Sequence, residues 1–300
     1  MKDQAEKLRK IISSLDTDVN TTTKPNKAKV IAVTSGKGGV GKTNFAVNFA
    51  ISLSLLGYKV LVLDVDFGLA NADIIAGINV KNTISDCIVT GMDINEIINE
   101  GPGGIKIISG GSGLHEISIM NETNIKRFLN LVENLESTMD FIIIDTGAGI
   151  SNTVMNFLMA SEEVIVVTTP DPTAIMDGYT MIKALTLNGY KGKLNILANI
   201  VNNRIEAYDT YDRLKTVSQN FLKCDLNFLG YLERSNTVVK AIRTQTPFII
   251  LNPNSSVSRN IKAIALKYAD SNKHIHAKHI HTKQNGSFAD RLMRLIFSKR

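Results

Sequence analysis

The sequence predicts an α/β fold: a three-layer, mostly parallel, doubly wound sheet between two layers of helices. From Lys29 onward, strand-type and helix-type patterns alternate along the chain. Several strand candidates, such as residues 60–63 and 141–144, are apolar at every position, as strands covered on both faces must be. Ligands bind at the carboxyl ends of such strands, so functional residues are expected there.

The expected elements follow from these patterns, and the body spans residues 29–270 without an internal repeat or a second globular domain. The predicted strands are residues 29–34, 59–64, 105–109, 140–145, 163–168, 194–200 and 226–231. The predicted helices are residues 43–57, 121–138, 151–161, 174–188, 207–222 and 257–270.

A glycine-rich loop joins the first strand to the first helix, which Lys42 and Thr43 open. This strand–loop–helix context is that of the phosphate-binding loop of P-loop NTPases. Lys42 would reach the β- and γ-phosphates, and the Thr43 hydroxyl would bind Mg²⁺, while backbone N–H groups hold phosphate oxygens. The residues expected at the nucleotide are Gly36, Lys37, Gly38, Gly39, Val40, Gly41, Lys42, Thr43 and Asn44.

Two other strands end in acidic residues. Asp64 and Asp66, two residues apart, point the same way off the pleat. Asp145 closes the apolar strand at 141–144 and is followed by Thr-Gly-Ala-Gly. That arrangement is the Walker B geometry, in which Asp145 would hold Mg²⁺ through a water and the glycines would sense the γ-phosphate.

Charge and cysteine content narrow the class of protein. The chain has 34 basic and 28 acidic residues, of which the last 30 residues hold seven and one, which leaves 27 of each in the rest. A body without net charge argues against nucleic acid as a specific partner. Cys87 and Cys224 lack metal or redox spacing, and the polar start is unlike a signal peptide, so we expect a cytoplasmic protein.

Both ends of the chain carry helical patterns outside the body. Residues 1–15 read as a short amphipathic helix that would order only on a partner, against a frayed tail as the alternative, and residues 16–28 read as a flexible linker. Residues 271–287 form a polar linker, whose two His-x-His pairs are a tether or, less favoured, a metal site.

The last segment, residues 288–300, has an apolar side opposed by basic residues, as in interfacial membrane helices. The residues expected to bind membrane are Phe288, Arg291, Leu292, Leu295, Ile296 and Phe297. The alternative is a helix that docks on the body or on a partner, and both states can alternate with the bound nucleotide.

The loop spelling Gly-Lys-Gly-Gly-Val-Gly-Lys-Thr resembles the deviant Walker A motif of the MinD/ParA class of ATPases. The resemblance implies an ATP-dependent homodimer in which Lys37 reaches the nucleotide of the partner subunit. It also implies that Asp66 activates the attacking water, while Asp64 supports the Mg²⁺ and hydrogen-bond shell. Related ATPases read adenine with an asparagine where Asn199 stands. Asn202, Asn203 and a simple strand-end cap are the alternatives.

Within this class the chain resembles FlhG (FleN/YlxH), a family that limits flagellar number or position. The variant Asp-Thr-Gly-Ala-Gly at Asp145 and the N-terminal Asp-Gln-Ala-x-x-Leu-Arg pattern carry that resemblance. In the family this pattern stimulates the GTPase FlhF, which implies partner contacts by Asp3, Gln4, Leu8 and Arg9. Further implied partners are the membrane and a flagellar C-ring component or transcription factor. The alternatives are a MinD-type division-site regulator and a ParA-type DNA partition ATPase.

Overall fold

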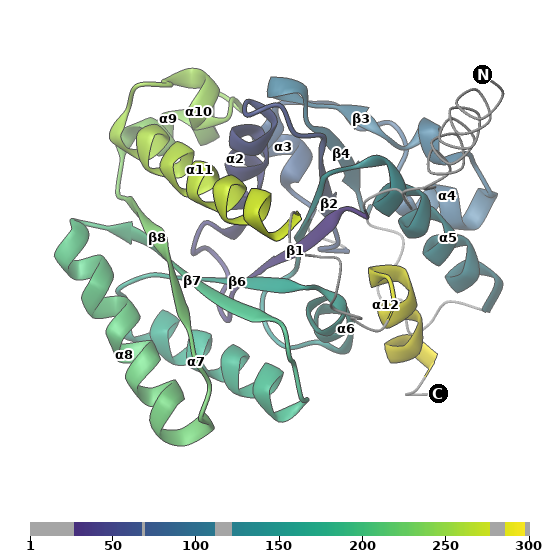
Figure 1. Cartoon of the computed structure of the whole chain (residues 1–300). Helices are drawn as coiled ribbons and strands as arrows, with labels where there is room; N and C mark the ends of the chain where they lie inside the picture. Colours follow the sequence, from purple (N-terminus) through teal and green to yellow (C-terminus); the bar gives the residue numbers. More distant parts are fainter. Residues whose placement is uncertain (1–26, 68–69, 112–121, 277–285, 298–300) are drawn as a thin grey trace, which may run out of the picture.

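A computed structural model describes residues 27–67, 70–111, 122–276 and 286–297. Its centre is an eight-stranded sheet in the order β3-β4-β2-β5-β1-β6-β7-β8 (Figure 1). Every neighbouring pair is parallel except β3 with β4 at one edge. The strands are β1 (Lys29–Thr34), β2 (Val60–Asp64), β3 (Asn99–Glu100), β4 (Lys106–Ser109), β5 (Phe141–Asp145), β6 (Glu163–Thr168), β7 (Lys193–Val201) and β8 (Asn227–Glu233).

Two hydrophobic cores, one on each face of the sheet, give the three layers that the sequence predicts. Neighbouring residues of β1 face opposite cores, Val30 and Ala32 one, Ile31 and Val33 the other. The first core takes α4 (Ile84–Thr90), α5 (Glu122–Thr138), α6 (Asn152–Ala160), α7 (Pro172–Leu187), α8 (Arg204–Leu222) and α12 (Phe288–Phe297). The second takes α2 (Lys42–Ser54), α3 (Ala72–Ala76), α9 (Asn236–Arg243), α10 (Phe248–Leu251) and α11 (Ser256–His276).

The doubly wound fold class is confirmed, and the seven predicted strands end within two residues of their expected positions. The two-residue β3 and the short helices α3, α4, α9 and α10 escaped prediction, because a few residues give no readable period. Helix α11 continues to His276, so the predicted helix end at residue 270 is six residues too early. Residues 271–276 contain no Gly or Pro that would stop it.

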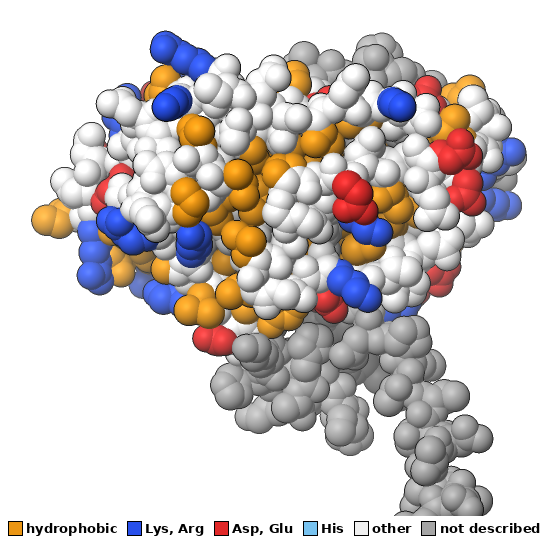
Figure 2. All heavy atoms as spheres, turned by 90° about the horizontal axis from the view of Figure 1, so that it is seen from above, with side chains coloured by type: hydrophobic (Ala, Val, Ile, Leu, Met, Phe, Trp, Pro, Cys, Tyr) orange, Lys and Arg blue, Asp and Glu red, His pale blue; other side chains and the backbone are white. Residues whose placement is uncertain are grey.

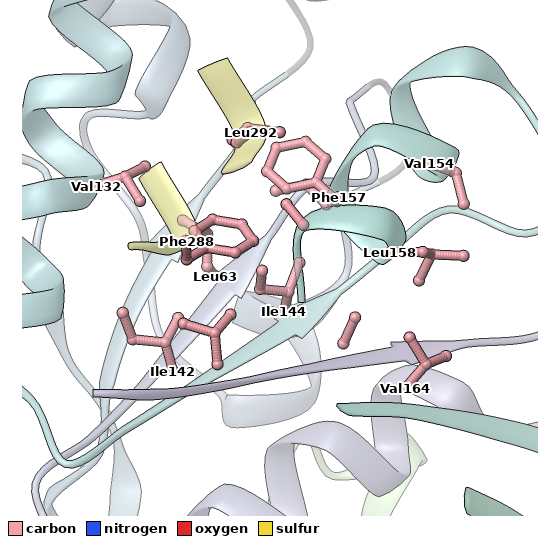
Figure 3. Packing of buried hydrophobic residues seen from close by; sticks show 14 of the residues in the cluster. Leu63, Val132, Ile142, Ile144, Val154, Phe157, Leu158, Val164, Phe288 and Leu292 are labelled. Atoms are coloured by element: carbon pink, nitrogen blue, oxygen red, sulfur yellow. The ribbon is translucent and has the colours of Figure 1, made fainter. Parts of the chain in front are cut away.

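The C-terminal helix α12 lies against α5 and α6 on one face of the sheet (Figures 1 and 3). Phe288, Leu292 and Ile296 are buried in the first core, and the Phe288 ring stacks on Phe157 with centroids 6.4 Å apart. Leu295 and Phe297 are partly buried against the same core. This is the docked alternative of the sequence analysis, and membrane binding stays a prediction that requires the helix to leave the body.

Polar contacts fix the position of α12. The buried carboxylate of Glu136 accepts hydrogen bonds from the backbone N–H groups of Phe288 and Ala289, at 2.9 and 3.2 Å. These are unpaired donors at the start of any helix, so Glu136 acts as a cap supplied by another element. Arg291 Nε donates to the carbonyl oxygen of Ala160 at the end of α6, at 2.7 Å. The helix is therefore held by both apolar and polar contacts.

Candidate nucleotide site

The phosphate loop, residues 35–41, leads from the central strand β1 directly into α2. Gly41 is the N-cap of α2 with φ 86°, a left-handed conformation that favours glycine. A Cβ at Gly36 would collide with the backbone of Asp177, so the start of the loop lies directly on α7. Glycine is thus required at the start of the loop because α7 lies too close for a side chain, and at its end because the backbone is left-handed.

A cavity of about 730 Å³ opens at this loop, a volume that suits a nucleotide. The loop lines it with Gly38, Gly39 and Gly41, and the first turn of α2 lines it with Lys42, Thr43 and Asn44. Asp66 lines it from the end of β2, and Gly147 lines it from the segment after β5. A Cβ on Gly147 would lie 3.2 Å from Asp66 Oδ1, so these two segments meet at the cavity. The structure therefore brings together the three motifs that the sequence separates.

Lys42, which lines the cavity, forms a buried ion pair with Asp145, with Nζ and Oδ1 2.9 Å apart. Burial raises the pKa of Asp145, against the opposing charge of Lys42 and a hydrogen bond from Thr43. Thr43 and Asp145 therefore place a hydroxyl and a carboxylate next to each other. Hard oxygen donors of this kind fit Mg²⁺, which binds through few protein groups and otherwise through water and phosphate oxygens.

Within the described residues, no cluster of three or more His, Cys, Asp or Glu side chains could hold a metal without such help. Mg²⁺ would therefore be held by Thr43 and Asp145 together with the nucleotide, and it would neutralise phosphate charge there. The His-x-His pairs of the sequence analysis are not among the side chains that the structure describes.

The Asp64 carboxylate is buried and accepts three backbone hydrogen bonds. It pairs in register with Asp145 across β2 and β5, and it is 1% exposed. Its Oδ1 accepts from the N–H of Asp66 at 3.0 Å, and its Oδ2 accepts from those of Asn71 and Ala72 at 2.9 and 3.1 Å. Burial and the charge of Asp145 raise the pKa of Asp64 to about 7. Asp64 thus holds the backbone after β2 through three hydrogen bonds, and its support of the Mg²⁺ shell stays a prediction.

Lys37 points to the outer side of the loop. Its Nζ donates to Thr173 Oγ1 at 2.7 Å and lies 3.7 Å from Asp171 Oδ2, at the N-terminus of α7. Both charged side chains are about half exposed, at 44% and 51%. Lys37 does not line the 730 Å³ cavity of its own chain. Its expected reach to the nucleotide of a second subunit stays a prediction.

Asn199 ends up beside the loop, but its amide bonds to backbone. Nδ2 donates to the carbonyl oxygen of Val40 at 2.7 Å, and Oδ1 accepts from the N–H of Ile200 at 2.9 Å. This is the strand-end alternative of the sequence analysis. Asn202 Nδ2 donates to Glu206 Oε1, and Asn203 Oδ1 accepts from the N–H of Glu206 as the cap of α8.

A second cavity of about 260 Å³ adjoins the loop at Gly41 and Asn44. The end of β8 and helix α9 line its other side with Glu233, Arg234, Ser235, Val238, Val239 and Ile242. Sequence reasoning missed these residues. The rule that ligands bind at the carboxyl ends of parallel strands would have found them, had it been applied to the last strand.

Comparisons with known proteins agree with this geometry. A family model described as an AAA domain matches residues 28–200. The antiactivator FleN of Pseudomonas aeruginosa is 34% identical over 80% of this chain and 85% of its own. The flagellum site-determining protein YlxH of Helicobacter pylori is 40% identical over 79% of this chain and 80% of its own. The chain belongs to the FlhG (FleN/YlxH) family of MinD/ParA-type ATPases. As an FlhG-type protein it hydrolyses ATP.

Solved structures show the same fold for this FlhG-type chain. MinD of Pyrococcus furiosus has a TM-score of 0.66 at 19% identity, over 81% of this chain and 99% of its own. MinD of Pyrococcus horikoshii, solved with Mg-ADP, has a TM-score of 0.66 at 23% identity, over 84% and 99%. In the described part of this chain, no helix is long and apolar enough to cross a membrane.

Proposed function

We propose that the chain is an ATP-driven switch that controls flagellar number or placement. The observation that carries this proposal is the match to FleN and YlxH along most of the chain, together with a second lysine in the phosphate loop. ATP and Mg²⁺ bind in the 730 Å³ cavity, and ATP closes a homodimer. Hydrolysis with the help of Asp66 returns the chain to the monomer.

Features at the carboxyl edge of the sheet support a dimer there. Lys37 is held only at the surface, by groups that water can replace. Exposed apolar side chains surround the same edge: Ile74, Ile150, Met176 and Ile242. Apolar side chains gathered around a charged ligand site favour a protein partner over open solvent. A triphosphate offers a lysine of a second subunit more charge than a diphosphate does, so the nucleotide would set the oligomeric state.

The Lys37→Ala variant is expected to bind ATP but to lose ATP-dependent dimerisation, because Lys37 would contact the nucleotide of the other subunit and not that of its own chain. Size-exclusion chromatography with light scattering, with and without a non-hydrolysable ATP analogue, measures this. Lys126→Ala, an exposed lysine on α5, is the matched control and should dimerise normally. A stable ATP dimer of Lys37→Ala would refute the role of Lys37 across the interface.

The N-terminal segment would act on the GTPase FlhF. Its motif residues Asp3, Gln4, Leu8 and Arg9 lie outside the described residues, so this part rests on the sequence pattern alone. A synthetic peptide of residues 1–20 is expected to raise the GTPase rate of FlhF, and the Gln4→Ala peptide to raise it far less. Full stimulation by the Gln4→Ala peptide, or none by either, would remove Gln4 from the mechanism.

Membrane binding would follow release of α12. Helix α6 connects the two sites, because Ser151 caps it just after the phosphate-sensing segment and its last carbonyl accepts from Arg291 of α12. The freed helix would expose Phe288, Leu292 and Ile296 beside Arg291 and Arg294, which suits an anionic membrane surface. The protein would then be cytoplasmic and peripheral at the inner face of the cell membrane.

The other readings find less support. On the face seen in Figure 2, hydrophobic side chains gather along the middle, and Lys and Arg are scattered between acidic residues. A ParA-type DNA partition protein needs a continuous basic surface. A MinD-type division regulator would share the fold, but it would leave the N-terminal pattern unexplained.

A further inference from the structure

The surface that α12 covers lies on α5 and α6 (Figure 3). We call it the α12 site and define it by the Glu136 carboxylate, the Phe157 ring and the Ala160 carbonyl oxygen, which all contact α12. Four residues of α12 are buried there: Phe288, Ala289, Leu292 and Ile296. A helix that fits this site therefore needs free N–H groups at its start and apolar side chains at these four positions.

The N-terminal segment enters the body at one end of the α12 site. The N–H of Ala28 donates to the carbonyl oxygen of Glu136 at 2.7 Å, and the carboxylate of the same residue caps α12. Hydrogen bonds from Ser287 and, in addition, the charge of Lys27 hold the pKa of Asp290 below its usual range, so Lys27 lies close to the first turn of α12. The residues before Lys27, which lie outside the described part of the chain, therefore start out beside the site.

The N-terminal sequence repeats the pattern of α12. Residues 3–12 read Asp-Gln-Ala-Glu-Lys-Leu-Arg-Lys-Ile-Ile, and residues 287–296 read Ser-Phe-Ala-Asp-Arg-Leu-Met-Arg-Leu-Ile. In an alignment without gaps, three of the four buried positions of α12 have the same residue in both segments: Ala5 with Ala289, Leu8 with Leu292 and Ile12 with Ile296. Both segments also have basic residues at their fifth and eighth positions. The apolar face that fills the α12 site is therefore present twice in the chain.

The cap at the start of the helix is also present twice. In α12, the N–H of Asp290 donates to Ser287 Oγ at 3.0 Å, and the N–H of Ser287 donates to Asp290 Oδ2 at 2.8 Å, which is a capping box. Asp3 and Glu6 stand at the corresponding positions of the N-terminal segment. Asp is as good an N-cap as Ser. A helix of residues 3–12 would therefore begin with the same kind of cap and present its first N–H groups to the same carboxylate.

One buried position differs, and it decides which helix binds better. Phe288 of α12 stacks on Phe157, whereas the N-terminal segment has Gln4 at this position. A glutamine there would lose the aromatic contact and bury an amide in an apolar surrounding, which costs free energy. The α12 helix therefore holds the site in the structure, and the N-terminal segment can take the site only when α12 is away.

We propose that residues 3–12 are a second occupant of the α12 site, which they take as a helix when α12 leaves it. The connection is long enough, because residues 14–27 reach about 45 Å when extended and the ten-residue α12 is about 15 Å long. The two ends of the chain thus compete for one surface. The consequence, which rests on the proposed function, is that a chain with α12 on the membrane hides Gln4 against its own body. Only a chain with docked α12 then presents Gln4 to FlhF.

The test uses the full-length protein with the substitution Gln4→Phe. It supplies the one buried residue that the N-terminal segment lacks and leaves the body unchanged. Two occupants of similar affinity then share the site, so hydrogen exchange over residues 288–297 should become faster by about tenfold or more, and exchange over residues 3–12 should slow. Lys10→Phe is the matched control, because it adds the same ring at the position that corresponds to the exposed Arg294. It should leave both exchange rates at their wild-type values.

A second pair of variants gives the N-terminal segment most of the site. In Gln4→Phe/Leu292→Ala, α12 lacks a buried side chain, so exchange over residues 3–12 should be slower by about tenfold or more than in Lys10→Phe/Leu292→Ala. If Leu292→Ala prevents folding, the single substitutions decide, because they lie outside the body.

Equal exchange rates over residues 3–12 in the Gln4→Phe and Lys10→Phe proteins would overturn the proposal. Faster exchange of α12 without slower exchange of residues 3–12 would overturn it as well, because α12 would then leave without being replaced. No nucleotide, membrane or FlhF enters the measurement. Its failure would therefore leave the proposed function standing, and a failure of the proposed function would not change its result.

Discussion

Replacement of Asp66 by Asn is expected to lower kcat for ATP hydrolysis by about 100-fold or more, with little change in the affinity for MgATP. Asp66 lines the 730 Å³ cavity beside Gly147, where the end of the triphosphate would lie. Asp145 is paired with Lys42, and the oxygens of Asp64 are taken by three backbone N–H groups. We therefore propose that Asp66 is the acid that orients and activates water.

Phosphate release and equilibrium binding of a fluorescent ATP analogue separate the two effects in the Asp66→Asn variant. We also expect this variant to accumulate the ATP-bound dimer, because the step that resets it is blocked. Asp212→Asn, at an exposed position of α8, is the matched control and should keep wild-type turnover. Wild-type turnover in Asp66→Asn would remove Asp66 from the mechanism.

The Leu292→Ala variant is expected to lower the free energy of unfolding by about 3 kcal/mol. Leu292 is fully buried in the first core, although it lies in a segment that reads from sequence as a membrane helix. Truncation removes apolar contacts and leaves a cavity that rigid neighbours on α5 and α6 cannot fill (Figure 3). Urea unfolding followed by circular dichroism measures the change.

A control in the same helix makes this result specific. Met293 is 41% exposed, so Met293→Ala should change the free energy of unfolding by less than about 0.5 kcal/mol. If Leu292→Ala and Met293→Ala had equally small effects, α12 would not be docked on the nucleotide-free protein in solution. The release of α12 would then be unnecessary as a step in membrane binding.

The parts that sequence predicted well are those with a local physical signal. Apolar runs such as residues 141–144 predict buried strands, since a parallel strand is covered on both faces. The phosphate loop is recognisable because its glycines, Lys42 and Thr43 must stand at fixed spacing to surround a phosphate. Asp66 and Asp145 could be located because they follow predicted parallel strands, whose carboxyl ends lie at one edge of the sheet.

The features that could not be predicted from sequence are those that depend on which residues a side chain contacts in the folded protein. Lys37 reads as a lysine for a second subunit, but only the fold shows that Asp171 and Thr173 hold it within one chain. The amphipathic pattern at 288–297 fits a membrane and a docked helix equally well, because both offer an apolar surface. The same sequence pattern therefore fits either surface, and only the fold shows that the protein body covers the apolar side of this helix.

The sequence by itself determined the fold class, the phosphate loop and the acids around it, because backbone period and motif spacing are local properties. Only the tertiary structure shows that Glu136 and Arg291 hold α12 on the body and that the amide of Asn199 donates a hydrogen bond to the Val40 carbonyl of the phosphate loop. Those contacts join residues more than 100 positions apart. Their geometry is set by how the two cores pack, and no local pattern encodes it.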